Sequence, residues 1–148
     1  MNTLYDTDLY AWSQEQAHLL RTLQPAGLDW EHLAEEIDDV GSSVEAAVES
    51  HLQRIVEHLL KLAYAPAYLV TDNRRGWQRS IAAQRPQLAK KVRKNPSLEC
   101  KLEELLADAY GTARLDVLTR LPELEEEALP ETCPWTLDEV RREGFYPV

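Results

Sequence analysis

The chain has 148 residues, of which 44% are hydrophobic and 28% are charged, and its formal net charge is −10. This length suits one domain that buries about 70% of its unfolded surface. Leucine and alanine supply 39 residues against 12 for valine and isoleucine, which favours helices because unbranched side chains keep their rotamer freedom there. The glycines, at positions 27, 41, 76, 111 and 144, are too far apart for a Rossmann fingerprint or a P-loop.

The N-terminal residues and the two cysteines bear on the cellular compartment. The N-terminal residues lack the basic and apolar regions of a secretory signal, so we expect none. No run approaches 18 apolar residues, so we expect no membrane span. Cys100 and Cys133 form no CxxC motif. We therefore expect two reduced thiols in a cytoplasmic protein.

The first half of the chain carries apolar residues at helical spacing. A helix is predicted over residues 7–23. Asp29 is placed to cap a second helix over residues 30–40, and Gly41 is expected to end it.

A third helix is predicted to extend from there to Tyr64. Ser42 and Glu45 have the spacing of a capping box at its start. Ala65-Pro66 is expected to stop it, because the residue before a proline avoids the α region. This helix carries the clearest apolar stripe in the chain, formed by Val44, Val48, Leu52, Ile55, Leu59 and Leu62, with His51 among them.

A loop is expected up to Asp72 or Asn73, followed by a fourth helix that ends near Lys94. Pro86 should kink or split this helix near Arg85. Asn95 is then placed as the N-cap, and Pro96 at the first position, of a fifth helix that ends at Leu121-Pro122.

A short helix is predicted near the C-terminus. Thr136 and Glu139 make a capping box for it, and Gly144 is expected to close it. Since no segment reads as a convincing strand, the sequence predicts an all-α bundle. This bundle is one domain over residues 1–148, with about five main helices plus the short C-terminal one.

Five short motifs resemble a known family. They are Tyr5-Asp6-x-Asp8 with Trp12, Asp29-Trp30-x-x-Leu33-Ala34-Glu35-Glu36-Ile37, His58-Leu59-Leu60-Lys61, Pro96-Ser97-Leu98 and Glu131-Thr132-Cys133-Pro134-Trp135-Thr136. Together they resemble the bacterial domain-of-unknown-function family number 29, over nearly the whole chain. The resemblance implies a small bacterial helical protein and no activity. It also implies an unbroken fourth helix, from which Pro86 is a departure.

Metal ligation is the first chemistry to consider. A carboxylate precedes a histidine by three residues, as in di-metal helical bundles, in the pairs Glu15/His18 and Asp29/His32, with Glu57 as a further carboxylate. Asp29 is better explained as a cap. His51 lies in an apolar stripe, where a hydrogen bond to a neighbouring helix is the usual explanation. The sequence therefore predicts no metal and no cofactor.

Catalytic groups are sparse. Cys133 lies just before a helix, which can lower a thiol pKa, but no histidine is near it in the sequence and a packing role is favoured. Glu36, beside Ile37, is the carboxylate best placed for acid–base chemistry. If helices bring Glu36 together with His51 and His58, these three side chains would line a polar pocket. Trp12 and Trp77 lie in apolar stripes, and we expect both in the core.

The charge of −10 is unevenly distributed. Residues 73–94 contain no acid and eight basic residues, whereas residues 29–39 contain six acids and no lysine or arginine. Three explanations stay open: pairing with acidic helices of the same molecule, a basic face that meets a partner protein or a second copy, and nucleic acid. Nucleic acid is the least favoured, because the rest of the chain carries −18 and would repel phosphate. The candidate basic face comprises Arg74, Arg75, Arg79, Arg85, Lys90 and Lys91.

These observations favour a non-enzymatic cytoplasmic module that acts through protein–protein contact or regulation. The reasons are the missing nucleophile constellation, phosphate loop and complete metal set. The alternative is a small-molecule or metal-dependent bundle enzyme that uses Glu36, His51 and His58.

Overall fold

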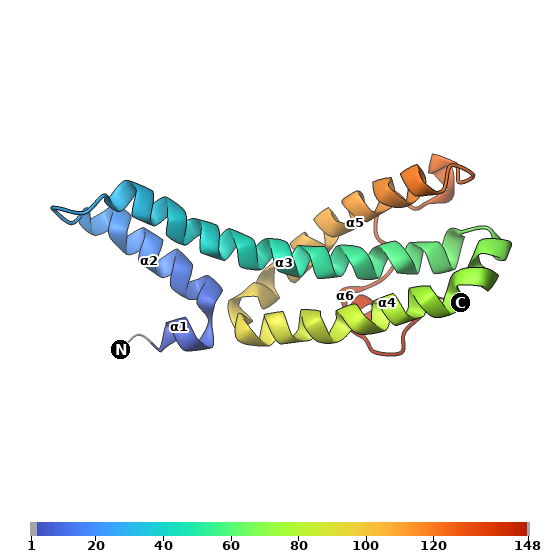
Figure 1. Ribbon diagram of the computed structural model, residues 1–148, viewed down its shortest axis with the longest axis horizontal. Coiled ribbons are helices and arrows are strands. Elements are labelled where there is room, and N and C mark those ends of the chain that lie inside the picture. Colours follow the sequence, from blue (N-terminus) through green and yellow to red (C-terminus); the bar gives the residue numbers. More distant parts are fainter. Residues whose placement is uncertain (1–2, 148) are drawn as a thin grey trace. The chain divides into compact units, whose positions relative to one another are not determined.

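The computed structural model describes residues 3–147 and contains no strand among them. Its helices are α1 (Leu4–Thr7), α2 (Leu9–Leu23), α3 (Trp30–Tyr64), α4 (Ala67–Lys94), η1 (Pro96–Lys101, 3-10), α5 (Leu102–Arg120), η2 (Glu126–Ala128, 3-10) and α6 (Leu137–Arg141). Figure 1 shows these elements in sequence colours. The all-α prediction is confirmed.

The described residues gather into two compact units. The first unit comprises the chain up to Val48 together with Lys90–Lys101, and the second comprises Glu49–Ala89 together with the chain from Leu102 onwards. Both α3 and α4 therefore contribute to each unit. The single domain over residues 1–148 stays a prediction.

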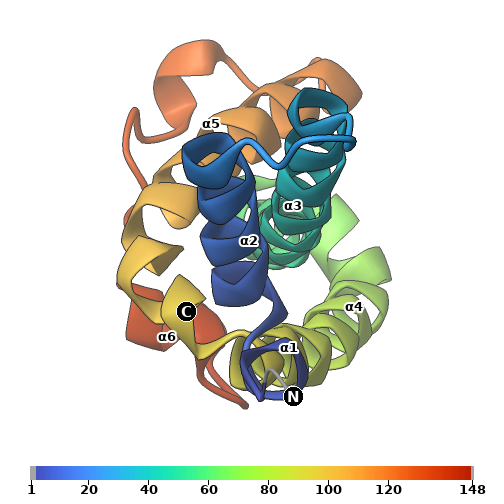
Figure 2. The ribbon, with the colours of Figure 1, turned by 90° about the vertical axis from the view of Figure 1, so that its left-hand side faces the viewer.

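Gly41 does not end a helix. Because α3 runs unbroken from Trp30 to Tyr64, the predicted break at Gly41 and the capping box at Ser42 and Glu45 are wrong. Gly41 is buried, and a Cβ atom on it would lie 2.5 Å from the hydroxyl oxygen of Ser13 on α2. The missing side chain thus lets α2 approach the first half of α3, beside which it lies in both views (Figures 1 and 2).

A second junction of the first unit joins the start of α2 to the start of η1 and the residue before it. The buried Asp8 carboxylate caps α2 by accepting from the Ala11 N–H at 2.8 Å, and it also accepts from the N–H and hydroxyl of Ser97 at 2.7 and 2.9 Å. The Asn95 side chain accepts in return from the Tyr10 N–H at 2.9 Å. Asn95 was expected to cap the helix that follows it, but its side chain instead accepts from a backbone N–H at the start of α2. Residues 96–101 form the 3-10 helix η1.

The fourth helix differs from the prediction at its start and at its proline. It begins at Ala67, directly after the Pro66 that ends α3, instead of near Asp72. It is not split, because α4 continues through Pro86 to Lys94. Pro86 and Ala82 are both exposed, so the carbonyl oxygen that the proline leaves without a donor can be hydrated.

Large aliphatic side chains from three long helices form the core of the second unit. Those with the least exposure include Leu52, Ile55 and Leu59 of α3, Ile81 and Leu88 of α4, and Leu102 and Val117 of α5. In the C-terminal segment, Leu129 and Val140 are also buried. The capping box of Thr136 and Glu139 that starts α6 is confirmed, with two hydrogen bonds of 3.1 Å.

Arg85 holds the C-terminal segment of the second unit. It is 3% exposed, and its guanidinium donates to the carbonyl oxygens of Val140 and Phe145, both at 2.9 Å. Its guanidinium carbon lies 5.6 Å from the centre of the Tyr146 ring, and burial lowers the pKa of Arg85. Arg85 is therefore not part of an exposed basic face, which corrects that prediction.

Candidate functional site

The hairpin of α2 and the first half of α3 uses small residues where the helices meet. Ser13 and Ala17 of α2 and Ala34 and Gly41 of α3 are all buried. Small side chains let two helix backbones approach closely, so larger neighbours on each helix are left at the side of the contact.

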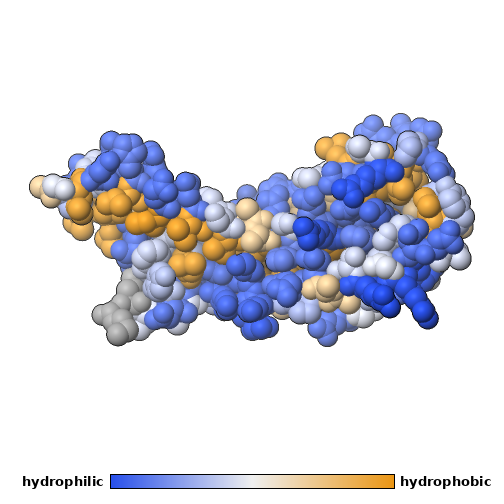
Figure 3. Space-filling model, in the orientation of Figure 1, coloured by the Kyte–Doolittle hydropathy of each residue, from blue (hydrophilic) through white to orange (hydrophobic). Residues whose placement is uncertain are grey.

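Those larger neighbours form an open apolar surface. The exposed fractions are 40% for Leu19, 70% for Leu23, 42% for Leu33 and 37% for Val40. We call these four residues, with the half-buried Ile37 and Trp12, the open hairpin face. Figure 3 shows the apolar side chains gathered over this hairpin. Leu33, Ile37 and Val40 do not belong to the core, and neither does Trp12, which was expected there.

A charged contact closes the other side of the hairpin. Arg21 of α2 pairs with Asp38 of α3 at 2.6 Å. Leu19 and Leu23 each lie two positions from Arg21, and Val40 lies two positions from Asp38, a spacing of about 200° around a helix. The apolar side chains therefore share the side of the hairpin opposite to this ion pair.

The hairpin is strongly acidic. Glu31, Glu35, Glu36 and Asp39 are exposed on α3, and none of them forms an ion pair within residues 3–147. A group that covered the open hairpin face would therefore meet uncompensated negative charge beside it.

The second unit contains a charged cleft of about 390 Å³. Its lining comprises Arg54, Glu57, His58 and Lys61 of α3, Ser80, Ala83 and Gln84 of α4, and Arg120 of α5. The Lys61 ammonium donates to the buried Glu57 carboxylate at 2.9 Å, and the Arg120 guanidinium lies 3.8 Å from the same oxygen. We call this site the cationic cleft, because its lining contains three permanent cations and one carboxylate.

The three residues of the predicted polar pocket belong to two different units. Glu36 is exposed and belongs to the first unit, whereas His51 and His58 belong to the second. His51 Nδ1 is 2.6 Å from Gln84 Oε1 on α4, which confirms the expected hydrogen bond to a neighbouring helix. His58 Nδ1 donates to the Arg54 carbonyl oxygen at 2.8 Å, and burial lowers the pKa of His58.

The other candidate metal ligands were the pairs Asp29/His32 and Glu15/His18. Asp29 accepts from the His32 ring at 2.6 Å, and this hydrogen bond lowers the pKa of Asp29 and raises that of His32. Within residues 3–147, no three histidine, cysteine or acidic side chains come together as metal ligands would. The described residues therefore give no site at which a metal role for His18 or His32 could be argued.

Both cysteines are free thiols. Burial raises the pKa of Cys133, so the helix start beside it does not activate the thiol. Trp77, expected in the core, is only half-buried, and the Lys61 ammonium lies 6.0 Å from the centre of its ring.

The basic residues of α4 show little internal pairing. Arg74, Arg75, Arg79 and Lys90 are exposed and Lys91 is half-buried. No ion pair joins any of the five to a carboxylate among residues 3–147. Pairing with acidic helices of the same molecule therefore does not account for them in the part of the chain that the structure describes.

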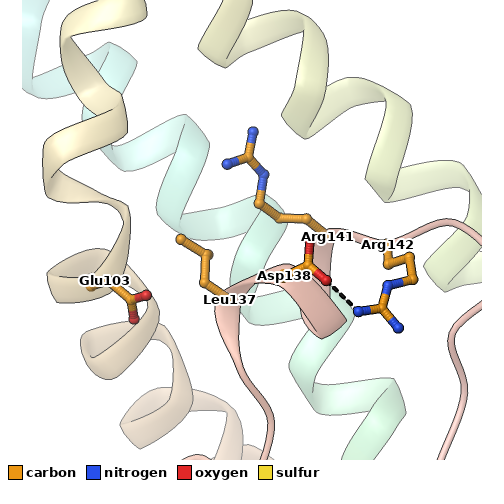
Figure 4. Close-up of a pocket in the computed structure, with 5 residues that line it drawn as sticks. All are labelled: Glu103, Leu137, Asp138, Arg141 and Arg142. Carbon is orange, nitrogen blue, oxygen red and sulfur yellow. Dashed lines mark hydrogen bonds and ion pairs between the residues drawn. The ribbon is translucent and has the colours of Figure 1, made fainter.

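A second cleft of about 390 Å³ lies between α5 and α6, lined by Glu103, Leu137, Asp138, Arg141 and Arg142. Figure 4 shows Asp138 turned toward Arg142, with which it is paired, and Glu103 across the cleft. The charged groups of this cleft do not converge on a common point, so we assign no chemistry to it.

Sequence reasoning missed part of both sites. His58 was singled out, but Arg120 and Ser80 were not. Arg120 lies on α5, remote from α3 in the sequence, and the side of α4 that faces His58 depends on how the two helices pack. Of the open hairpin face, Trp12 was assigned to the core. The dense acids beside this face were the signal that could have identified it as a surface.

Comparisons with known proteins agree with the fold. The model of a family described as "Domain of unknown function DUF29" matches residues 4–146. The crystal structure of an alpha-helical protein of unknown function from Rhodospirillum rubrum is 24% identical in sequence, with a TM-score of 0.75 over 98% of this chain and 92% of that one. No curated protein sequence matches this chain. In residues 3–147, no helix is both long and apolar enough to cross a membrane.

Proposed function

This chain belongs to the DUF29 family, and we propose that it is a non-enzymatic interaction module that binds a partner protein through the open hairpin face. The observation that carries the proposal is the exposure of Leu19, Leu23, Leu33 and Val40 on one side of the hairpin. Contiguous exposed apolar surface with a polar rim is typical of protein interaction sites. A cytoplasmic, bacterial setting is part of this proposal.

The charge around the face favours one kind of partner. Residues 29–39 carry six acids and no lysine or arginine, so a second copy of the hairpin would bring like charges together. A basic amphipathic helix satisfies both features, because its apolar stripe can cover the leucines while its lysines or arginines meet the acidic rim. The proposed occupant is therefore such a helix of another protein.

Binding to a designed peptide tests the proposal. The probe is a synthetic helix with a leucine stripe and lysine flanks, compared with a leucine/glutamate peptide of the same pattern. Fluorescence anisotropy with the full chain should show binding of the lysine peptide that weakens as salt rises. The double variant Leu19→Ser/Leu23→Ser should weaken this binding at least about tenfold, since covering two exposed leucines contributes about 1–3 kcal/mol.

Leu115 supplies the matched control, because it is a leucine 64% exposed on α5, outside the hairpin. Leu115→Ser should leave peptide binding unchanged. Equal weakening by Leu115→Ser, or equal affinity for the glutamate peptide, would overturn the proposal. Sedimentation that showed a dimer lost only in Leu19→Ser/Leu23→Ser would replace the basic partner by a second copy.

The alternative of an enzyme built on Glu36, His51 and His58 has less support. Glu36 is exposed in the first unit, and His51 is engaged with Gln84. The cleft beside His58 is rich in arginine and lysine, which disfavours a metal cation.

A further inference from the structure

We propose that the cationic cleft of the second unit binds the phosphate group of a small molecule. The inference is independent of the interaction proposed for the hairpin, because it uses other residues in the other unit. It starts from the balance of charge inside the cleft.

Glu57 is the single carboxylate among the residues that line the cleft. The Glu57 side chain is 10% exposed, and one of its oxygens faces both Lys61 and Arg120. Arg54 forms no ion pair within residues 3–147. Three permanent cations against one anion leave two positive charges without compensation, which a phosphate dianion would balance.

Unused hydrogen-bond donors of the cleft residues suit the same ligand. The ammonium of Lys61 has three N–H groups, and one hydrogen bond to a side chain, that to Glu57, is found within residues 3–147. This side chain is only 11% exposed, so its other donors are largely shielded from bulk water. The exposed guanidinium groups of Arg54 and Arg120 supply paired N–H donors, whose geometry matches the oxygens of a phosphate.

His58 and Ser80 add selectivity for a tetrahedral oxyanion. Since the Arg54 carbonyl oxygen can only accept, His58 Nδ1 carries the proton, and Nε2 of the neutral ring is an acceptor. It can accept from the P–OH group of hydrogen phosphate, the dianion of inorganic phosphate, while the Ser80 hydroxyl can donate to another oxygen. The cleft volume of about 390 Å³ lies in the range of small-molecule sites and leaves room for an organic group on the phosphate.

Titration calorimetry on the full chain tests this site with inorganic phosphate and with glucose 6-phosphate, at constant ionic strength. Arg54→Gln changes an exposed side chain that has no ion pair within residues 3–147, and Arg120→Gln leaves Glu57 paired with Lys61, so both variants should fold. Each should weaken binding of both probes about tenfold, the effect of losing a charge-assisted hydrogen bond.

Arg79→Gln is the matched control, because Arg79 is an exposed arginine of the same unit that does not line the cleft. It should leave the affinity unchanged. Equal weakening by Arg79→Gln would show non-specific attraction and overturn the site. Absence of binding by both probes at millimolar concentration would also overturn it, as would tighter binding of citrate than of either probe.

Discussion

The two halves of α3 have the same apolar spacing and opposite surroundings. In the second half, Leu52, Ile55 and Leu59 are fully buried, whereas in the first half Leu33 is 42% and Val40 is 37% exposed. The second half belongs to a unit with α5 and most of α4, while α2 packs on the first half through small residues. An apolar stripe therefore indicates which side of a helix can be buried. It does not indicate whether the same chain or a partner buries it.

The largest expected effect compares one leucine from each half. Leu59→Ala should lower the free energy of unfolding by about 2–5 kcal/mol, since it leaves a cavity in a closed core. Leu33→Ala should lower it by less than about 1 kcal/mol, because much of that side chain is already in water. Urea unfolding followed by circular dichroism measures both. Similar losses would mean that the first half of α3 is covered in solution.

The next effect concerns the contact between α2 and α3. Gly41→Ala should lower the free energy of unfolding by about 1–2 kcal/mol, because the new Cβ atom would overlap the Ser13 hydroxyl. Gly76→Ala is the control, since a Cβ atom there meets nothing within 4 Å, and it should raise stability by about 0.5–1 kcal/mol. Adding Ser13→Ala to Gly41→Ala should recover part of the loss. A Gly41→Ala protein as stable as Gly76→Ala would contradict the close packing.

The smallest expected effect is a difference between the pKa values of two histidines, one in each half of α3. NMR titration should place the pKa of His32, in the first half, above 6.5, because Asp29 hydrogen-bonds its ring. The pKa of His58, in the second half, should lie below 6.5, because burial penalises the charged ring. His32→Gln and His58→Gln assign the two signals, and the reverse order would contradict the difference in burial.

These shifts have opposite consequences for stability. The contribution of His32 is fully present below about pH 6.5 and is lost as the pH rises through its folded-state pKa. His58 has the opposite effect. As the pH falls below about 6.5, the unfolded chain binds a proton at His58 before the folded chain does, so the free energy of unfolding decreases.

Features that depend on neighbours within a few turns of a helix could be predicted from the sequence. The all-α class, the stop of α3 before Pro66 and the capping box of Thr136 and Glu139 belong to this group. Their physical causes are rotamer freedom, proline sterics and hydrogen bonds between residues three apart. The pairing of His51 with a neighbouring helix was also predictable, because a polar ring in an apolar stripe needs a partner.

Only the tertiary structure decided the roles whose partners are remote in the chain. From the sequence, Arg85 is one more basic residue of the fourth helix. In the structure it donates to the Val140 carbonyl oxygen, 55 residues away. From the sequence, Asn95 is a cap for the helix that follows it. In the structure its side-chain oxygen accepts from the Tyr10 N–H, 85 residues away. Gly41 reads as a helix end until Ser13 lies against it. Packing and desolvation between distant segments govern these residues, and the spacing along one helix does not encode them.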